Sequence, residues 1–337
     1  MDLVCLGGLW GWDLEELTHD LAALESTGRW AVVLPFSGQP VCARLGTWSK
    51  QAPQVAGTYL GPDPLLWRSS LDATTYQDGV AAIRGAIAAG TVYQANLCRV
   101  IRAPLPDPDK SDLQGLYQLL VAGNPSPYAG MIRLPGINVV TASPELFLER
   151  QGHVVRSGPI KGTGAVESDL QEKDRAENVM IVDLVRNDLS RVAIPGSVRV
   201  PTLLQVQHHP GLVHLVSYVE AELATNIGWP GMIAAAFPPG SVTGAPKSTA
   251  LEIIDQLEPA DRGLYCGAIG WVDADRKTGC LAVAIRTFWT DGPDLCFGTG
   301  AGITWASNPR TEWHETELKA ARLIALAGQS WEGAHPN

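Results

Sequence analysis

Strand-like and helix-like segments follow one another along this 337-residue chain without strict alternation. Strand patterns occur in succession near residues 137–148 and 153–161, and again near 197–206 and 213–220. In a doubly wound parallel sheet a helix follows each strand, and this order does not match that arrangement. The sequence therefore favours an α+β fold, and its length is ample for a sizeable core.

Hydrophobic spacing predicts four helices. In the first, Tyr76, Val80, Ile83 and Ile87 recur at helical spacing, and Gly90 is a suitable stop. The predicted helices cover residues 76–87, 172–189, 248–257 and 308–328. Further strands are predicted at 30–36, 93–100, 267–272 and 281–289, and the glycine-rich run 298–302 is predicted to interrupt the chain before the last helix.

A turn or linker is predicted at residues 61–64, which read Gly-Pro-Asp-Pro. We expect a short N-terminal region, residues 1–70, that packs on a main domain of residues 71–330. The N-terminal region contains strand-like pieces separated by Gly and Pro, whereas the motifs described below all lie in the main domain.

Charge and cysteine content restrict the partners and the compartment. Lys and Arg number 25 and Asp and Glu 35, so the formal net charge is −10. Such a chain is a poor binder of nucleic acid or of an anionic membrane, although local cationic groups can still hold a small anion. The six cysteines are scattered without C-x-x-C spacing, and neither a signal peptide nor a membrane-spanning segment is evident. We therefore expect a reduced protein of the cytoplasm.

Two predicted helices place acidic residues three positions apart, and hence on one face. Asp174 and Glu177 lie on the first, and Glu312 and Glu315 lie on the second, with Lys319 four positions after Glu315. If the two faces oppose each other, four carboxylates converge, and Mg²⁺ is the natural counter-ion. From spacing alone, the alternative is two solvated faces with ordinary ion pairs such as Glu315–Lys319.

Three other features are candidates for chemistry. Lys161 stands between Pro-Ile and Gly-Thr at the end of a predicted strand, where burial would favour the neutral, nucleophilic amine; an exposed lysine is the alternative. The run Gly-Thr-Gly-Ala-Gly at 298–302 can present backbone N–H groups to a carboxylate. His214 lies in an apolar strand, where a hydrogen-bonded core histidine is the alternative to a functional one.

Nine motifs occur in order over about residues 70–328. They are S-P-E-L at 143–146, P-I-K-G-T at 159–163, D-R-A-E-N at 174–178 with V-D-L-V-R-N-D at 182–188, H-L-V-S at 214–217, P-G-S-V-T-G-A-P-K at 239–247, C-G-A-I-G at 266–270, I-R-T at 285–287, G-A-G-I at 300–303 and E-W-H-E at 312–315 with Lys319. Together they resemble the chorismate-utilising enzymes, which include anthranilate, aminodeoxychorismate, isochorismate and salicylate synthases. The resemblance implies large mixed or antiparallel β-sheets packed in a sandwich with helices outside.

Two positions discriminate between the reactions of that family. Aminodeoxychorismate synthases resemble this chain in P-I-K-G-T, whereas anthranilate synthases usually have Ala at the position of Lys161. Enzymes that add water to chorismate carry a lysine base at the position of Gln94, and an amide does not titrate near neutrality. The resemblance therefore implies component I of an aminodeoxychorismate synthase, in para-aminobenzoate and folate biosynthesis. The alternatives are anthranilate synthase component I, a subunit serving both pathways, and a non-catalytic chorismate-binding subunit.

The resemblance also implies roles for single residues. Lys161 would attack chorismate C2 while Glu145, a buried general acid, protonates the departing C4 hydroxyl, and ammonia would then add at C4 and expel the lysine. Glu177 and Glu315 would hold Mg²⁺, with the other two helix carboxylates in support through water. The third implied catalytic residue is His214, in contact with the ring. The implied substrate contacts are Gln94, Gly162, Thr163, Thr243, Lys247, Arg286, Gly300, Ala301, Gly302 and Lys319.

The ammonia is expected to come from outside this chain. No cysteine stands in a G-x-C-x-G elbow, the setting of a glutamine amidotransferase nucleophile. We therefore expect a heterodimer with a glutamine amidotransferase subunit, or the use of free ammonium salts.

Overall fold

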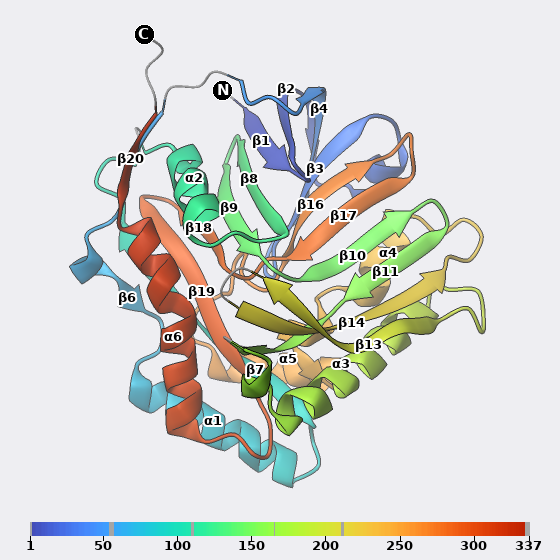
Figure 1. Cartoon of the computed structure of the whole chain (residues 1–337), viewed down its shortest axis with the longest axis vertical. Helices are drawn as coiled ribbons and strands as arrows, with labels where there is room; N and C mark the ends of the chain where they lie inside the picture. The colour runs from blue at the N-terminus through green and yellow to red at the C-terminus, as the bar shows by residue number, and fades with distance from the viewer. Residues whose placement is uncertain (1, 54–56, 109–110, 165, 210–211, 334–337) are drawn as a thin grey trace.

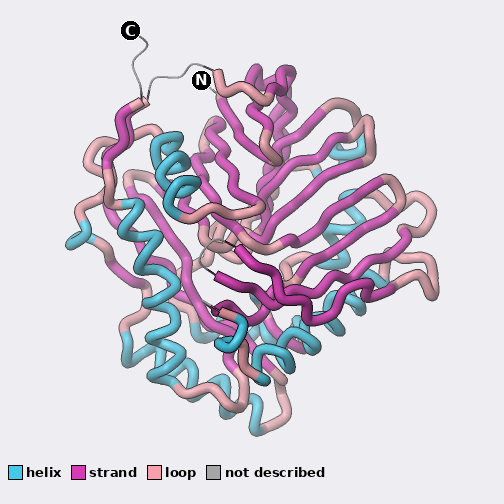
Figure 2. Tube along the Cα trace, viewed as in Figure 1, coloured by secondary structure: helices cyan, strands magenta, loops and turns pink. Residues whose placement is uncertain are grey.

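The computed structural model describes residues 2–53, 57–108, 111–164, 166–209 and 212–333. Its main feature is a sheet of 18 strands, accompanied by a two-stranded ribbon of β5 (Thr58–Leu60) and β20 (Ser330–Glu332). The strands form the body of the molecule and the helices lie around its outside (Figure 1, Figure 2). This architecture confirms the predicted α+β class and its large antiparallel sheet.

The sheet can be followed from neighbour to neighbour, and its strand pairs are antiparallel. The first part contains β13 (Arg199–His209), β14 (Leu212–Glu222), β11 (Val154–Gly158), β12 (Ile160–Gly164), β10 (Leu146–Gln151), β17 (Thr278–Val283), β16 (Ala268–Asp273), β3 (Arg29–Leu34) and β4 (Val41–Ser49). The second contains β2 (Leu9–Thr18), β1 (Leu3–Leu6), β8 (Tyr128–Leu134), β9 (Ile137–Ser143), β18 (Thr287–Asp291), β19 (Asp294–Ile303), β7 (Gln94–Pro104), β6 (Arg68–Ser69) and β15 (Gly244–Ala245). The strands β1 to β4 lie in the middle of this order and connect the two parts. The division of the chain at residue 70 stays a prediction.

Six α-helices surround the sheet in the described chain: α1 (Ala73–Ala88), α2 (Leu113–Gly123), α3 (Glu172–Ser190), α4 (Trp229–Ala236), α5 (Lys247–Leu257) and α6 (Pro309–Ala327). The four predicted helices correspond to α1, α3, α5 and α6. Their ends follow the expected capping chemistry: Asp72 accepts a hydrogen bond from the Thr75 N–H at 2.8 Å, and Asn308 accepts one from Arg310 at 3.1 Å. The helices α2 and α4 were not predicted.

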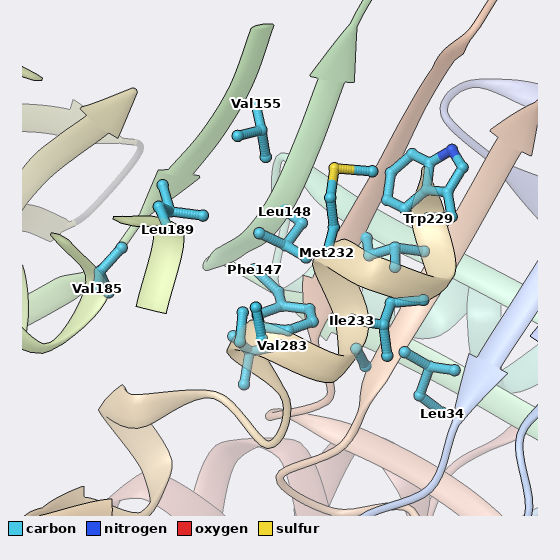
Figure 3. Close-up of a cluster of buried hydrophobic side chains, with 14 of the residues drawn as sticks. Leu34, Phe147, Leu148, Val155, Val185, Leu189, Trp229, Met232, Ile233 and Val283 are labelled. Atoms are coloured by element: carbon cyan, nitrogen blue, oxygen red, sulfur yellow. The ribbon is translucent and has the colours of Figure 1, made fainter. Parts of the chain in front are cut away.

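A hydrophobic core fixes α3 and α4 against the first part of the sheet (Figure 3). Val185 and Leu189 of α3 pack in the same cluster as Leu148 of β10 and Val155 of β11. Each side chain of this kind contributes roughly 1.5–3 kcal/mol when it is fully buried. The helix α3 is therefore held firmly, and its N-terminal half carries the first pair of acidic residues.

Two predictions about strands near the C-terminus are wrong. Residues 281–289 do not form one strand, because β17 ends at Val283 and β18 begins at Thr287, with Arg286 between them at a φ of 52°. The run 298–302 does not interrupt the chain, because it is the second half of β19 and pairs with β7 throughout. Its glycines do not form a turn; they are needed because neighbouring side chains leave little room for a Cβ.

In the part of the chain that the structure describes, no helix is both apolar and long enough to traverse a bilayer. All six cysteines are free thiols, and five of them are buried.

Candidate active site

A cavity of about 650 Å³ opens between β12, the second half of β19, the start of α3 and one face of α6. It brings together most of the residues that the sequence implicated. Those that line it are Glu145, Lys161, Gly162, Asp174, Glu177, His214, Arg286, Gly300, Ala301, Gly302, Glu312, Glu315 and Lys319. The volume lies in the ordinary range for small-molecule sites.

Two of the implied substrate contacts, Thr243 and Lys247, are turned to other partners and are not part of the lining. The Thr243 side chain is fully buried, and its hydroxyl donates to the Pro239 carbonyl at 3.0 Å. The Lys247 ammonium donates to Asp188 at 2.7 Å and to the Ala236 carbonyl at 2.8 Å. Both side chains therefore stabilise the segment 239–247 and do not face the cavity.

Gln94 also lies outside the lining, and the side chain of Thr163 is not among those that the structure describes. Gln94 is fully buried behind Gly302, and neither polar atom of its side chain has a hydrogen-bond partner among the described residues. A Cβ at position 302 would lie 2.2 Å from Gln94 Nε2, so any larger residue there would require the Gln94 side chain to shift. Thr163 lies in β12 directly opposite His214 of β14.

Lys161 in β12 and Glu145, in the connection between β9 and β10, both face the cavity and are linked through Ser241. Lys161 Nζ donates to the Ser241 carbonyl at 3.1 Å. Glu145 is 5% exposed and shares a hydrogen bond with the Ser241 hydroxyl. A loop residue therefore sets the relative position of an amine and a carboxyl group that face the same space.

The environment of Glu145 keeps much of it protonated near neutral pH. Burial raises its pKa to about 7, against the opposing effects of the Ser241 hydrogen bond, the Lys161 charge and the Ile160 N–H. A carboxyl group with this pKa can donate a proton at neutral pH, as a general acid must.

The second half of β19 presents backbone N–H groups to the cavity. Asn96 and Cys98 of β7 pair with Gly302 and Gly300, yet their N–H groups donate away from β19, to the Thr243 carbonyl and to Glu258. These are therefore non-hydrogen-bonded pairs of the antiparallel ladder, and the peptide groups of Gly300 and Gly302 face the open edge. The Lys319 ammonium reaches the same edge, 3.1 Å from the Gly300 carbonyl.

Close packing explains why this strand is rich in glycine. A Cβ at position 298 would lie 2.0 Å from the Tyr265 ring, and one at position 300 would lie 2.6 Å from Cys98 Sγ. Contacts below 3.0 Å cannot be accommodated without movement. The glycines thus let β19 lie against buried side chains while its edge stays open.

Arg286 supplies a cationic group to the cavity. It follows β17 in a left-handed backbone conformation, with φ 52°, which is uncommon for a residue other than glycine and is concentrated at functional sites. Its side chain lines the cavity, and no ion pair or hydrogen bond of its guanidinium is found in the described ranges. Burial lowers the pKa of Arg286 from its usual value, but an arginine remains charged. This group is suited to a carboxylate.

The four helix carboxylates face the cavity, but they differ in burial and in the groups they contact. Burial raises the pKa of Glu177, and the neighbouring Asp174 and Glu315 add to this. Burial opposes ionisation of Glu315, but its ion pair with Lys319 at 2.7 Å lowers the pKa. Asp174 already caps α3 through the Gln171 N–H at 2.8 Å. Burial also raises the pKa of Glu312.

These carboxylates suit Mg²⁺ only in its usual, sparse coordination. Among the residues that the structure describes, no group of three or more ligating side chains is arranged to hold a metal. Mg²⁺ is usually bound through one or two carboxylates, with water and substrate oxygens completing its shell. Glu177 and Glu315 are the pair best placed for that role, because they lie on opposing helices and affect each other electrostatically.

Several residues of the site were not identified from the sequence. Ser241 contacts both Lys161 and Glu145, and Tyr265 and Asn96 line the cavity. Ser241 lies within the P-G-S-V-T-G motif and Tyr265 directly precedes C-G-A-I-G, so the motifs could have pointed to both residues. No motif pointed to Asn96.

Comparison with known proteins agrees with this geometry. The chain matches the family described as chorismate binding enzyme over residues 31–325. It belongs to the chorismate-binding enzyme family. The likeness to the menaquinone-specific isochorismate synthase of Escherichia coli, with a TM-score of 0.81 at 17% identity over 97% of this chain and 88% of that one, shows that the fold is shared.

Relatives of this chorismate-binding enzyme include two kinds of synthase. It is 36% identical over 270 residues to aminodeoxychorismate synthase component 1 of Salmonella typhimurium, covering 77% of this chain and 58% of that protein. It is 40% identical over 302 residues to anthranilate synthase component 1 of Streptomyces coelicolor, covering 86% and 56%. The chain thus spans a little over half the length of these relatives.

Proposed function

We propose that this chorismate-binding enzyme is component I of an aminodeoxychorismate synthase, which converts chorismate and ammonia into 4-amino-4-deoxychorismate. The observation that carries the proposal is the arrangement of Lys161 and Glu145, a lysine amine and a carboxyl group with a pKa of about 7, on one loop residue in the cavity. An amine at this place can form a covalent bond to the ring, which a general acid on the leaving oxygen assists.

The reaction is proposed in two displacements. The Lys161 amine forms a bond to C2 while the ring double bonds shift and the C4–O bond breaks, and Glu145 gives its proton to the departing hydroxyl, which leaves as water. Ammonia then forms a bond to C4, the double bonds shift back, and the C2–N bond to Lys161 breaks. The covalent step directs the nitrogen to C4, because C2 is occupied by the lysine.

The two carboxylates of chorismate are held by different groups. Arg286, together with the N–H groups of Gly300 and Gly302 and the ammonium of Lys319, is placed to bind one of them. Glu177 and Glu315 would hold a Mg²⁺ ion beside the other. When bound, that ion would offset the negative charge that the substrate brings to an acidic wall.

Ammonia is proposed to come from a separate glutamine amidotransferase subunit. The name of the Salmonella typhimurium relative, aminodeoxychorismate synthase component 1, is in keeping with a second component. We also propose that the protein works in the cytoplasm, where the six free cysteines would stay reduced.

Anthranilate synthase component I is the second candidate, because the Streptomyces coelicolor relative of that name is 40% identical. Incubation of the purified chain with chorismate, Mg²⁺ and ammonium chloride separates the two, with products analysed by liquid chromatography and mass spectrometry. We expect 4-amino-4-deoxychorismate with its enolpyruvyl group intact. Anthranilate and pyruvate would support the second candidate, and chorismate bound but unchanged would support a non-catalytic subunit.

A further inference from the structure

Arg262 and Glu258 form an ion pair beneath the floor of the cavity, and neither belongs to its lining. Their side chains are 2% and 5% exposed. Arg262 Nε and Nη2 donate to the two Glu258 oxygens at 2.8 and 2.7 Å, and the guanidinium lies 4.6 Å from the centre of the Phe36 ring. The pair is therefore bidentate, desolvated and out of reach of a bound substrate.

The remaining hydrogen bonds of the pair go to the cavity wall. Arg262 Nη1 donates to the Val242 carbonyl at 2.8 Å, and Nη2 donates to the Asn96 carbonyl at 3.2 Å. Glu258 accepts from the Cys98 N–H at 2.8 Å. Val242 and Asn96 line the cavity and Cys98 lies in β7, so the ion pair joins β7 to the segment 239–246.

The segment that the pair holds is the one that carries Ser241. Its carbonyl accepts from Lys161 and its hydroxyl bonds to Glu145. Because Ser241 directly precedes Val242, a shift of the Val242 carbonyl would move both contacts together. We infer that Arg262 and Glu258 are positioning residues, which set the relative place of Lys161 and Glu145 through Ser241. This inference rests on the proposed function for the roles of those two side chains.

The chemistry of the guanidinium explains why an arginine is needed here. Two buried carbonyls and a carboxylate need donors in fixed directions, which a planar guanidinium supplies and a single ammonium does not. Arg262→Lys keeps the charge but cannot make all four hydrogen bonds. Glu258→Gln keeps the shape but removes the negative charge and one acceptor.

A matched control is available at Arg150. Its side chain is 5% exposed and pairs with Glu25 at 3.1 Å, but it is not part of the cavity lining. Glu25 is 36% exposed, so this pair is less buried than Arg262–Glu258, but Arg150→Lys likewise replaces a buried arginine in an ion pair without touching the segment 239–246.

The first measurement is steady-state chorismate consumption together with the melting temperature. We expect Arg262→Lys and Glu258→Gln each to lower kcat at least about tenfold, since small displacements of reacting groups have effects of this size or more, with KM for chorismate within about twofold. Arg150→Lys should lower the melting temperature but keep kcat. Chorismate consumption reports on positioning whichever amino product forms, so product identity tests the proposed function separately.

The second measurement does not depend on activity. Reductive methylation followed by mass spectrometry gives the labelling rate of Lys161 relative to the exposed Lys277. We expect this ratio to change about two- to tenfold in Arg262→Lys, the equivalent of one hydrogen bond, and to stay constant in Arg150→Lys. If Arg262→Lys does not fold, Glu258→Gln gives the same test. Unchanged kcat and unchanged labelling in these variants would overturn the inference. It would also be overturned if Arg150→Lys lowered kcat as much as they do for the same fall in melting temperature, because the loss would then come from general destabilisation.

Discussion

Lys161 Nζ donates a hydrogen bond to the backbone carbonyl of Ser241 at 3.1 Å. The hydroxyl of the same serine bonds to Glu145, so an amine on β12 and an acid between β9 and β10 are positioned by one residue. Any change that moves this residue alters both partners at once. The first three predictions concern these two side chains.

Replacement of the proposed nucleophile should abolish C4 amination. We expect Lys161→Ala to lower kcat for 4-amino-4-deoxychorismate by at least about 10³-fold, because the covalent step is lost. Intact mass spectrometry during turnover should show a chorismate-derived adduct in the unaltered chain and none in this variant. Lys277→Ala, at an exposed position, is the control. Undiminished amination by Lys161→Ala would contradict the nucleophile role.

The rate should fall as pH rises above neutrality. Burial raises the pKa of Glu145 to about 7, so the protonated form needed for acid catalysis is lost above that pH. With free ammonia held constant, we expect kcat to fall by up to about tenfold per pH unit well above pH 7. Glu145→Gln should have a much lower kcat, and this kcat should not fall in the same way above pH 7. A wild-type rate that stays level to pH 9 would exclude Glu145 as the acid.

The same carboxyl group should make stability depend on pH. Its folded pKa of about 7 exceeds the ordinary value of 4.5, so its favourable contribution is complete below pH 4.5 and is lost as pH rises through 7. The penalty at pH 8 is roughly 3 kcal/mol, at about 1.4 kcal/mol for each pH unit between the two pKa values. Urea unfolding at pH 5 and pH 8 should therefore show Glu145→Gln gaining stability relative to wild type at the higher pH. The same difference in unfolding free energy between Glu145→Gln and wild type at both pH values would refute this.

A side chain at position 300 of β19 should damage both folding and binding. In Gly300→Ala the new Cβ would lie 2.6 Å from the Leu97 carbonyl and from Cys98 Sγ. We expect a loss of about 1–3 kcal/mol in unfolding free energy and a raised KM for chorismate. Gly85→Ala, with no atom within 4 Å of the new Cβ, should be neutral or stabilising by up to about 1 kcal/mol. Denaturant unfolding compares the two, and equal stability would refute the packing argument.

Removal of one charged ligand should weaken Mg²⁺ binding. We expect Glu177→Gln and Glu315→Gln each to raise at least about tenfold the Mg²⁺ concentration needed for half of the chorismate-dependent change in tryptophan fluorescence. Glu317→Gln is the matched control, because Glu317 lies on the same helix but pairs with His314 outside the cavity lining. The same Mg²⁺ requirement in all three variants would remove these carboxylates from the metal site.

The sequence predicted those elements whose signals are local. The helices α1 and α6 have side-chain caps at Asp72 and Asn308 and clear periodicity, and their positions are confirmed. The helix α4 has eight residues, of which five are buried, so its pattern has no polar face to reveal a period. The glycines of β19 predict a break in the chain, because the sequence does not reveal that Tyr265 and Cys98, on other segments, leave no room for a Cβ.

The site was predictable where a residue belongs to a recognisable motif. Lys161, Glu145 and the helix carboxylates were named from the sequence, and the structure gathers them around one cavity. The Arg262 contacts were not predictable, because they join positions 20 and 166 residues apart along the chain. Such contacts depend on the complete sheet and not on local pattern.

The open edge of β19 has a consequence for how this enzyme family diversifies. Every amino acid except proline has a backbone N–H, so the hydrogen-bond donors at positions 300 and 302 are kept through most substitutions. The side chains on the rest of the cavity wall can then change without loss of these donors. In the binding mode proposed above, changes of these side chains would alter the chemistry while the same strand still binds the ring.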